Sequence, residues 1–290
     1  MVDFTAKGAL LVGFDLIRRR PLLVLLWAGI FLLQTIAFAA VYRLFIVAAQ
    51  ASIFDGGAAS ASFRGETFAF TLARAAVSLV VISVVWSSAF RALLRPAERG
   101  PLAFGLEELS VLASWLIVQL VVAAVSAPLP VFLVSRFNGL NAQVIVQAVA
   151  AIEVLGRFWG VVAAVWAFER LRIAPFRCWS IARGRFWLLA VLIVGPAILE
   201  RLVDAAVHRL VLALGRGLPF ATPVPAYRFA PSGAQLQALF QPPALLQDVI
   251  LAGIGALMVA FMAGVVASAY RASLSEPQAA SFAGSVAEPS

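Results

Sequence analysis

The sequence has few of the residue types on which soluble enzymes rely. Only 12% of its 290 residues are charged, against about 25% in an ordinary soluble domain, and it contains one cysteine and one histidine. Without a CxxC pair or a Cys/His ligand set, neither structural zinc nor redox chemistry is expected. The sequence also has no glycine-rich phosphate loop, GxSxG elbow or HExxH motif, so we predict no catalysis, no cofactor and no metal.

Hydrophobic residues make up most of what remains. They account for 63% of the chain, against about 45–50% in a soluble domain, and the mean hydropathy is +0.98. A globular core of this length cannot hide so much apolar surface, whereas a bilayer can cover it. The composition therefore excludes a soluble enzyme and predicts an all-α, polytopic membrane protein.

Long apolar runs, two of them interrupted by charged residues, divide residues 21–271 into about six predicted transmembrane helices. At about 1.5 Å per residue, such runs are long enough to cross a hydrocarbon core of about 30 Å. The runs lie between Arg20 and Arg43, from Thr67 to Leu94, between Glu108 and Arg136, from Asn141 to Phe168, from Phe186 through Pro196, and between Asp248 and Arg271.

Three segments lie outside these spans. Residues 1–20 are expected to form an amphipathic helix at the membrane surface, and Pro21 marks its break from the first span. Six prolines in residues 214–243 exclude a continuous helix and predict a proline-rich outer loop. Residues 272–290 are predicted to be a flexible cytoplasmic tail.

The basic residues set the predicted orientation. The net charge is +8, and most of the 22 Lys and Arg residues fall on one side if the N-terminus is cytoplasmic, so we expect both termini in the cytoplasm. Anionic phospholipid is the expected partner, and a nucleic acid is not, because no soluble basic domain accompanies the charge. The predicted headgroup contacts are Arg18, Arg19, Arg20, Arg91, Arg95, Arg170, Arg172, Arg183 and Arg185.

Two charged residues interrupt the fourth span. Glu153 and Arg157 stand at i and i+4, on one face of a helix, where they can form an ion pair. An ionisable residue in lipid is costly and normally faces the bundle interior with a partner. A self-neutralised pair that orients the span is the preferred interpretation, and a substrate or ion site is the alternative.

A second charged cluster ends the fifth span. Glu200, Asp204 and His208 repeat at i, i+4 and i+8 and so share one helical face. Two carboxylates and an imidazole in this arrangement could bind a divalent metal or relay protons. Arg201 and Arg209 lie beside them, and a surface of mutual ion pairs explains the same residues without a ligand. We favour the ion pairs.

Arg74 in the second span and Asp248 in the sixth fall at membrane depths similar to that of Glu200. If these residues converge with Glu153 and Arg157, they form a polar cavity that opens to the outer side, as expected of a transport or lipid-headgroup site. Separate ion pairs that hold the helices in register are the alternative, which we slightly prefer.

The two cytoplasmic loops carry short arginine motifs. One reads Arg91-x-x-x-Arg95-Pro96-x-x-Arg99-Gly100, and the other leads from Arg170-Leu171-Arg172-Ile173-Ala174-Pro175 to Trp179-Ser180-x-x-Arg183-Gly184-Arg185-Phe186-Trp187. In these loops and the adjoining spans the chain resembles the YciC-like and glycerophosphodiesterase membrane-domain group of six-span bacterial proteins. The resemblance implies a bacterial inner-membrane location. It implies no catalysis, because the phosphodiesterase activity of fused relatives belongs to a soluble domain that this sequence lacks.

The sequence as a whole predicts a non-catalytic integral inner-membrane protein. Its expected role is that of a structural or accessory subunit of a membrane assembly that contacts anionic lipid, with protein partners or further copies of itself in the membrane. The alternative is a transporter or lipid-handling protein that uses the charged residues of the outer half as a solute or headgroup site.

Overall fold

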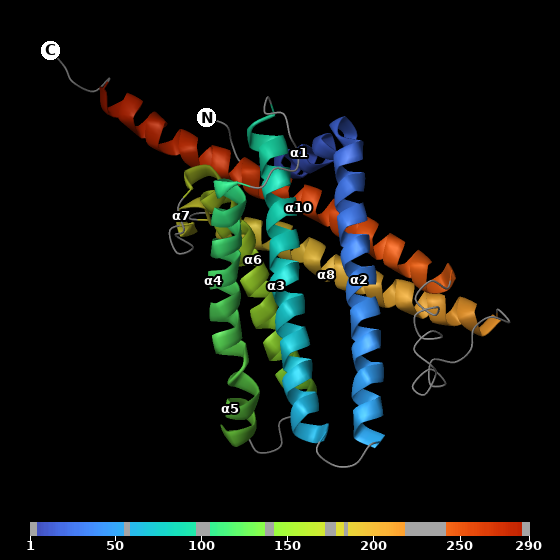
Figure 1. The fold of residues 1–290 in the computed structure, drawn as a ribbon. Coiled ribbons are helices and arrows are strands. Elements are labelled where there is room, and N and C mark those ends of the chain that lie inside the picture. Colours follow the sequence, from blue (N-terminus) through green and yellow to red (C-terminus); the bar gives the residue numbers. More distant parts are fainter. Residues whose placement is uncertain are drawn as a thin grey trace. The chain divides into compact units, whose positions relative to one another are not determined.

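The computed structural model describes residues 5–54, 59–96, 105–136, 142–171, 178–182, 185–217 and 242–285, and its regular elements there are all helices. Figure 1 shows them in chain order. They are α1 (Ala6–Arg19), α2 (Pro21–Phe54), α3 (Ala59–Leu94), α4 (Leu106–Ser126), α5 (Leu129–Arg136), α6 (Ala142–Arg170), α7 (Trp179–Ala182), α8 (Phe186–Gly217) and α10 (Pro242–Ser285). The predicted all-α class is confirmed.

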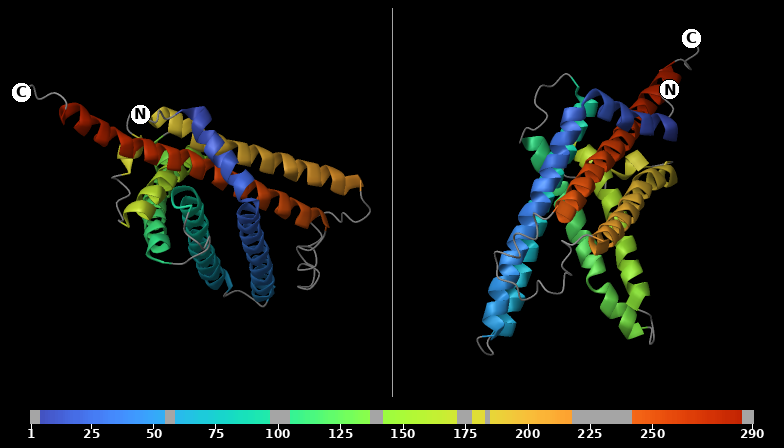
Figure 2. Two further views of the ribbon diagram at one scale, coloured as in Figure 1. Left: turned by 90° about the horizontal axis from the view of Figure 1, so that it is seen from above. Right: turned by 90° about the vertical axis from the view of Figure 1, so that its right-hand side faces the viewer.

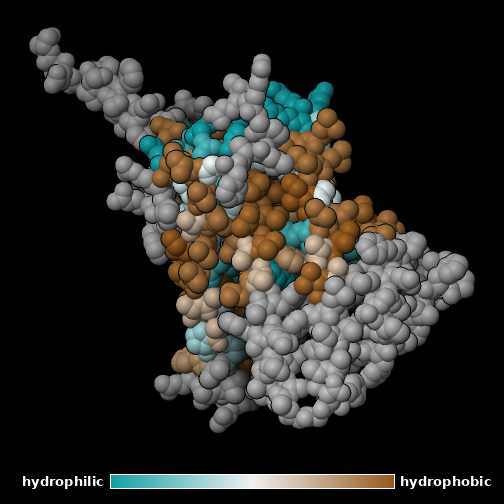
Figure 3. Space-filling view, viewed as in Figure 1, coloured by the Kyte–Doolittle hydropathy of each residue, from teal (hydrophilic) through white to brown (hydrophobic). Residues whose placement is uncertain are grey.

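Five described helices contain stretches long and apolar enough to cross a membrane. The stretches are Pro21–Val41, Leu72–Leu94, Leu106–Ser126, Gln147–Arg170 and Leu245–Leu274. They match five of the predicted spans and make the chain a polytopic helical membrane protein. The remaining predicted span begins at Phe186 as expected, and its described apolar stretch is the shorter Phe186–Pro196. On the face shown in Figure 3, hydrophobic residues cover most of the described surface, and hydrophilic residues gather near α1 and the start of α4.

The third span is shorter than the uncharged run that predicted it. α4 ends at Ser126, and α5 begins at Leu129 after a turn. Pro128 and Pro130 explain the break, because neither residue can donate the backbone hydrogen bond that continuation of α4 would require.

The described helices belong to two compact units, and α3, α8 and α10 each contribute to both. Unit 1 comprises Met1–Pro21, Ile82–Ile198 and Met258–Ser290, and unit 2 comprises Leu22–Val81 and Leu199–Leu257. The side-chain and backbone contacts described below each lie within one unit.

In unit 1, two glycines of α6 allow α4 to approach closely. A Cβ atom on Gly156 would lie 2.3 Å from Cγ2 of Val122, and one on Gly160 would lie 2.4 Å from Cζ3 of the buried Trp115. Small residues at such a crossing bring large apolar side chains into contact, which is how dispersion forces hold helices together in a membrane. This packing fixes the start of α4 relative to α6.

α1 is capped at its start and ends immediately before a proline. Gly8 N donates a hydrogen bond of 3.1 Å to Oγ1 of Thr5, and the helix ends at Arg19. After Arg20, Pro21 begins α2, where its missing N–H costs nothing because the first turn of a helix has no acceptor for it. The predicted break at Pro21 is therefore present.

In unit 2, polar contacts between α2 and α3 repeat one helical turn apart. Gln34 Nε2 donates a hydrogen bond of 2.8 Å to Oγ of Ser78, and the Arg74 guanidinium lies 5.7 Å from the ring centroid of Phe38. Gln34 and Phe38 are four residues apart on α2, as are Arg74 and Ser78 on α3, so the two contacts set the register of the pair.

The C-terminal boundary differs from the sequence prediction. A flexible tail was expected from residue 272, but α10 continues as a helix to Ser285. Ala272, where the tail was predicted to begin, is buried and so belongs to the packed side of α10. Most of the predicted outer loop, residues 218–241, lies outside the described residues.

Candidate functional site

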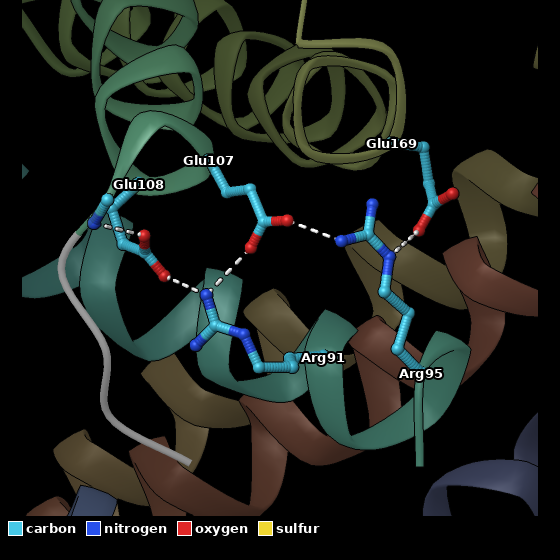
Figure 4. Close-up of polar contacts among 6 residues, drawn as sticks. Arg91, Arg95, Glu107, Glu108 and Glu169 are labelled. Carbon is cyan, nitrogen blue, oxygen red and sulfur yellow. Dashed lines mark hydrogen bonds and ion pairs between the residues drawn. The ribbon is translucent and has the colours of Figure 1, made fainter. Parts of the chain in front are cut away.

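Three helix ends of unit 1 bring five charged side chains together. Arg91 and Arg95 come from the end of α3, Glu107 and Glu108 from the first turn of α4, and Glu169 from the last turn of α6. Figure 4 shows that they alternate in sign, in the order Glu108, Arg91, Glu107, Arg95, Glu169. We call these five residues the charge ladder.

The ladder is held by direct ion pairs. Arg91 Nη2 donates to Oε2 of Glu107 at 2.8 Å and to Oε1 of Glu108 at 2.5 Å. Arg95 Nη1 donates to Oε1 of Glu107, and Arg95 Nε lies 3.5 Å from Oε1 of Glu169. The inner end is the more buried, since Arg91 is 6% exposed and Glu108 1% exposed. Charges buried this deeply require partners.

The local sequence explains why these residues meet. Arg91 and Arg95 are four residues apart and so share one side of α3 near its C-terminus, where the helix dipole favours cations. Two glutamates occupy the first turn of α4, where the dipole favours anions. Glu108 Oε2 also accepts a hydrogen bond of 2.8 Å from Gly105 N, which satisfies one of the donors at that helix start.

An aromatic ring lies beneath both guanidinium groups. The Cζ atoms of Arg91 and Arg95 lie 5.9 and 5.1 Å from the ring centroid of the fully buried Phe168. The ring of Phe90 lies 5.9 Å from that of Phe168. Cation–π attraction adds to the ion pairs here, most strongly at Arg91, which is 6% exposed.

Two further arginines bind the backbone at the end of α3. Arg20 Nη2 donates a hydrogen bond of 2.9 Å to the carbonyl oxygen of Pro96, and Arg271 Nη2 donates one of 2.5 Å to that of Leu93. These carbonyls lie at or just beyond the end of α3, where backbone acceptors lack helical partners. The same helix end therefore joins the segment after α1, the start of α4, the end of α6 and the end of the α10 span.

The structure separates the predicted headgroup contacts into different environments. Arg91 and Arg95 bind carboxylates in the ladder, which the sequence analysis did not predict, and Arg20 binds the backbone. Arg18 and Arg170 are exposed, and the Arg170 guanidinium lies 5.6 Å from the Trp166 ring centroid.

The other predicted headgroup residues divide further. Arg19 is exposed and pairs with Asp15 at 2.8 Å. Arg185 is half-buried, and Arg172 and Arg183 lie outside the described residues.

Arg74 lies near one end of its span. It is exposed, two residues from the start of the Leu72–Leu94 stretch. The rise from Arg74 to Arg91 along α3 is about 26 Å, close to the thickness of a hydrocarbon core. Arg74 and Arg91 therefore mark the two boundaries of one span.

The remaining predicted charges are only partly described. Glu153 is exposed and Arg157 half-buried on α6, and their ion pair stays a prediction. The backbone of α8 is helical through the second charged cluster, so the predicted i, i+4 and i+8 spacing on one helix is present. The side chains of this cluster lie outside the described part of the chain; they are those of Glu200, Arg201, Asp204 and His208. Asp248 is half-buried on α10. Convergence of these charges stays a prediction, and the described residues contain no group of three potential metal ligands.

The sequence analysis missed the three carboxylates of the ladder. Glu108 served there only as the boundary of a span, and Glu107 and Glu169 were not considered. A signal was present: two arginines one turn apart end one span, and two adjacent glutamates begin the next.

Cys178 is buried in unit 1, outside the membrane-spanning stretches. Its thiol lies near Trp159, and burial raises the pKa of the Cys178 thiol to about 11. The thiol therefore stays protonated at neutral pH, and a protonated thiol is a poor nucleophile and metal ligand.

Neither protein-family models, nor curated proteins, nor solved structures gave a significant match to this chain. What the fold and composition show is its class: the chain is a multi-pass helical membrane protein.

Proposed function

We propose that the chain is a non-catalytic inner-membrane protein that serves as a structural or accessory subunit of a membrane assembly and contacts anionic lipid. The observation that carries this proposal is the charge ladder. Its arginines and glutamates face and pair with one another across three helix ends (Figure 4). Groups arranged in this way stabilise a scaffold.

The apolar surface of the spans supports a role within an assembly. Large residues on each span remain exposed, among them Leu33 at 70%, Leu120 at 61% and Val191 at 67%. Lipid tails or the helices of a partner can cover such side chains, and association in a membrane depends on surfaces of this kind.

The placement of basic residues supports the proposed orientation. Lys7, Arg18, Arg170 and Arg271 are exposed, and they belong to α1 or to the helix ends that surround the charge ladder. The positive-inside rule assigns this end to the cytoplasm. The resemblance of the arginine loops to the YciC-like group agrees with an inner-membrane location.

Native mass spectrometry of the protein in nanodiscs that contain phosphatidylglycerol tests the proposal. We expect a second polypeptide at fixed stoichiometry together with retained phosphatidylglycerol. Reconstitution of the two purified chains should reproduce the complex. A lone chain that retains one defined solute, and loses it when Glu153 or Arg157 is neutralised, would refute the subunit role.

A second candidate, the transporter, is favoured by one observation. The side-chain oxygens of Ser87 and Ser114 are buried within spans and have no hydrogen-bond partner among the described residues. Buried polar atoms normally have a hydrogen-bond partner, and water or a small solute would supply one for each of these two oxygens. The test is solute uptake by proteoliposomes that contain the protein. Uptake that is lost in the Ser87→Ala and Ser114→Ala variants would favour the transporter, and equal uptake by empty vesicles would exclude it.

A further inference from the structure

One side of α1 is fixed to α10 by a close approach of two backbones. A Cβ atom on Gly264 would lie 2.5 Å from Gly13 N, so only glycine fits at this crossing. Ala9 and Leu16 are buried on the same side of α1 as Gly13. Figure 2 shows α1 lying across α10. α1 is therefore docked on a membrane-spanning helix and has a defined side that points away from it.

The opposite side of α1 combines apolar and basic residues. Lys7, Leu11, Phe14 and Arg18 follow one another at spacings of four, three and four residues, which places them on one helical face. All four are exposed, Leu11 at 53% and Phe14 at 57%. Phe14 also contacts α10, because its ring and the Phe261 ring are T-shaped to each other, with centroids 4.6 Å apart. We call these four residues the lipid face.

The neighbouring arginines do not belong to this face. Arg19 pairs with Asp15 on an adjacent side of the helix, and Arg20 donates to Pro96. The three consecutive arginines therefore have three different roles, and only Arg18 accompanies the exposed apolar residues.

The depth of α1 follows from its two connections. It leads through Arg20 directly into the span that begins at Pro21. Gly264, where α1 crosses α10, lies about two helical turns before Arg271, which binds the backbone at the end of the α3 span. Both connections place α1 at a membrane boundary.

We propose that the lipid face binds the surface of an anionic bilayer, with Leu11 and Phe14 inserted at the level of the headgroups and Lys7 and Arg18 bound to their phosphates. Apolar side chains flanked by basic ones are the arrangement that interfacial helices use. This inference rests on the lipid contact in the proposed function and assigns it to one surface. Because α1 is docked on α10, the surface is held in place before lipid binds.

The test measures lipid selectivity at α1 in the full chain. In a Cys178→Ala background, Leu11→Cys carries an environment-sensitive fluorophore, and the protein is reconstituted with spin-labelled phosphatidylglycerol or phosphatidylcholine. The ratio of quenching by the two lipids reports their relative affinity for this surface. We expect phosphatidylglycerol to be preferred, and the preference to weaken at high salt.

A neighbouring arginine provides the matched control. Arg18→Gln should lower the preference by about fivefold, the effect expected of one basic residue at an anionic surface. Arg19→Gln removes the same charge one position away and should change the ratio less than twofold, because Arg19 is off the face and paired with Asp15. Lys7→Gln should repeat the effect of Arg18→Gln.

Three results would overturn the proposal: a ratio of one in the parent protein, equal effects of Arg18→Gln and Arg19→Gln, or no quenching by either lipid. The measurement involves no partner protein. Its failure would therefore leave the subunit role intact, while a chain without a partner in mass spectrometry would leave the lipid face intact.

Discussion

Removal of the Arg91 guanidinium tests whether the charge ladder stabilises the helix ends. Arg91 is 6% exposed, and its Nη2 donates to Glu107 and to Glu108, which is 1% exposed. Arg91→Met keeps a long apolar side chain but leaves a buried carboxylate without this counter-charge. Breaking one partner of a buried pair costs about 3–5 kcal/mol, so the free energy of unfolding should fall by about that amount.

Unfolding by SDS in mixed micelles, followed by tryptophan fluorescence, measures this loss. Arg95→Met is the matched control, because the Arg95 side chain is 30% exposed and water screens its pairs, so the loss should be about 1 kcal/mol. Combining Arg91→Met with Glu108→Gln removes both buried charges and keeps an oxygen to accept from Gly105. The double variant should recover part of the loss. Equal losses for Arg91→Met and Arg95→Met, or strict additivity in the double variant, would refute the reasoning.

Three further predictions concern other sites. Gly264→Leu should displace α1, because a side chain there meets the Gly13 backbone, and limited proteolysis should then cleave within α1; unchanged protection would contradict the docking. Gln34→Leu should cost about 0.6 kcal/mol in the same SDS titration through loss of the bond to Ser78, and a loss above about 2 kcal/mol would require another cause. Cys178 should resist maleimide at pH 7.5 in the folded protein, because the thiolate fraction and the labelling rate rise only as the pH approaches the thiol pKa of about 11. Full labelling after denaturation is the control. Rapid labelling of the protein in micelles at neutral pH would contradict the burial of Cys178.

The spans were predictable because hydropathy is a local property. An uncharged run such as that after Arg20 requires an apolar environment whichever helices surround it. Five of the six predicted spans match described helices. The break at Pro128 was missed only because the prediction counted charges and ignored proline. Proline acts through the backbone, which hydropathy does not register.

The charge ladder was not predictable in the same way, because it depends on which helix ends meet. Basic residues beside a span usually bind lipid, and this rule assigned Arg91 and Arg95 to headgroups. Their carboxylate partners on α4, Glu107 and Glu108, lie 12 to 17 residues further along the chain, and Glu169 on α6 is more distant. The packing of α4 on α6 at Gly160 and the contact of Phe90 in α3 with Phe168 in α6 bring Glu169 into the same cluster.

α1 shows a related limit. The sequence predicted one amphipathic helix, and the structure shows apolar residues on two of its sides. Its packed side carries Ala9, Gly13 and Leu16, and its exposed side carries Leu11 and Phe14. A helix that contacts both a protein and a bilayer has two apolar sides, which no single periodicity describes.

The contacts at the end of α3 also bear on how the chain is made. The bond from Arg271 to Leu93 joins residues 178 positions apart, whereas the bond from Arg20 to Pro96 joins residues 76 apart. During translation, Arg20 is available as soon as α3 emerges, but Arg271 is synthesised only with the last helix. A nascent chain therefore leaves one carbonyl at this helix end without its arginine until α10 has been inserted. Insertion of α10 therefore adds a contact at the end of α3, so a chain truncated before Arg271 differs from a longer one far from the point of truncation.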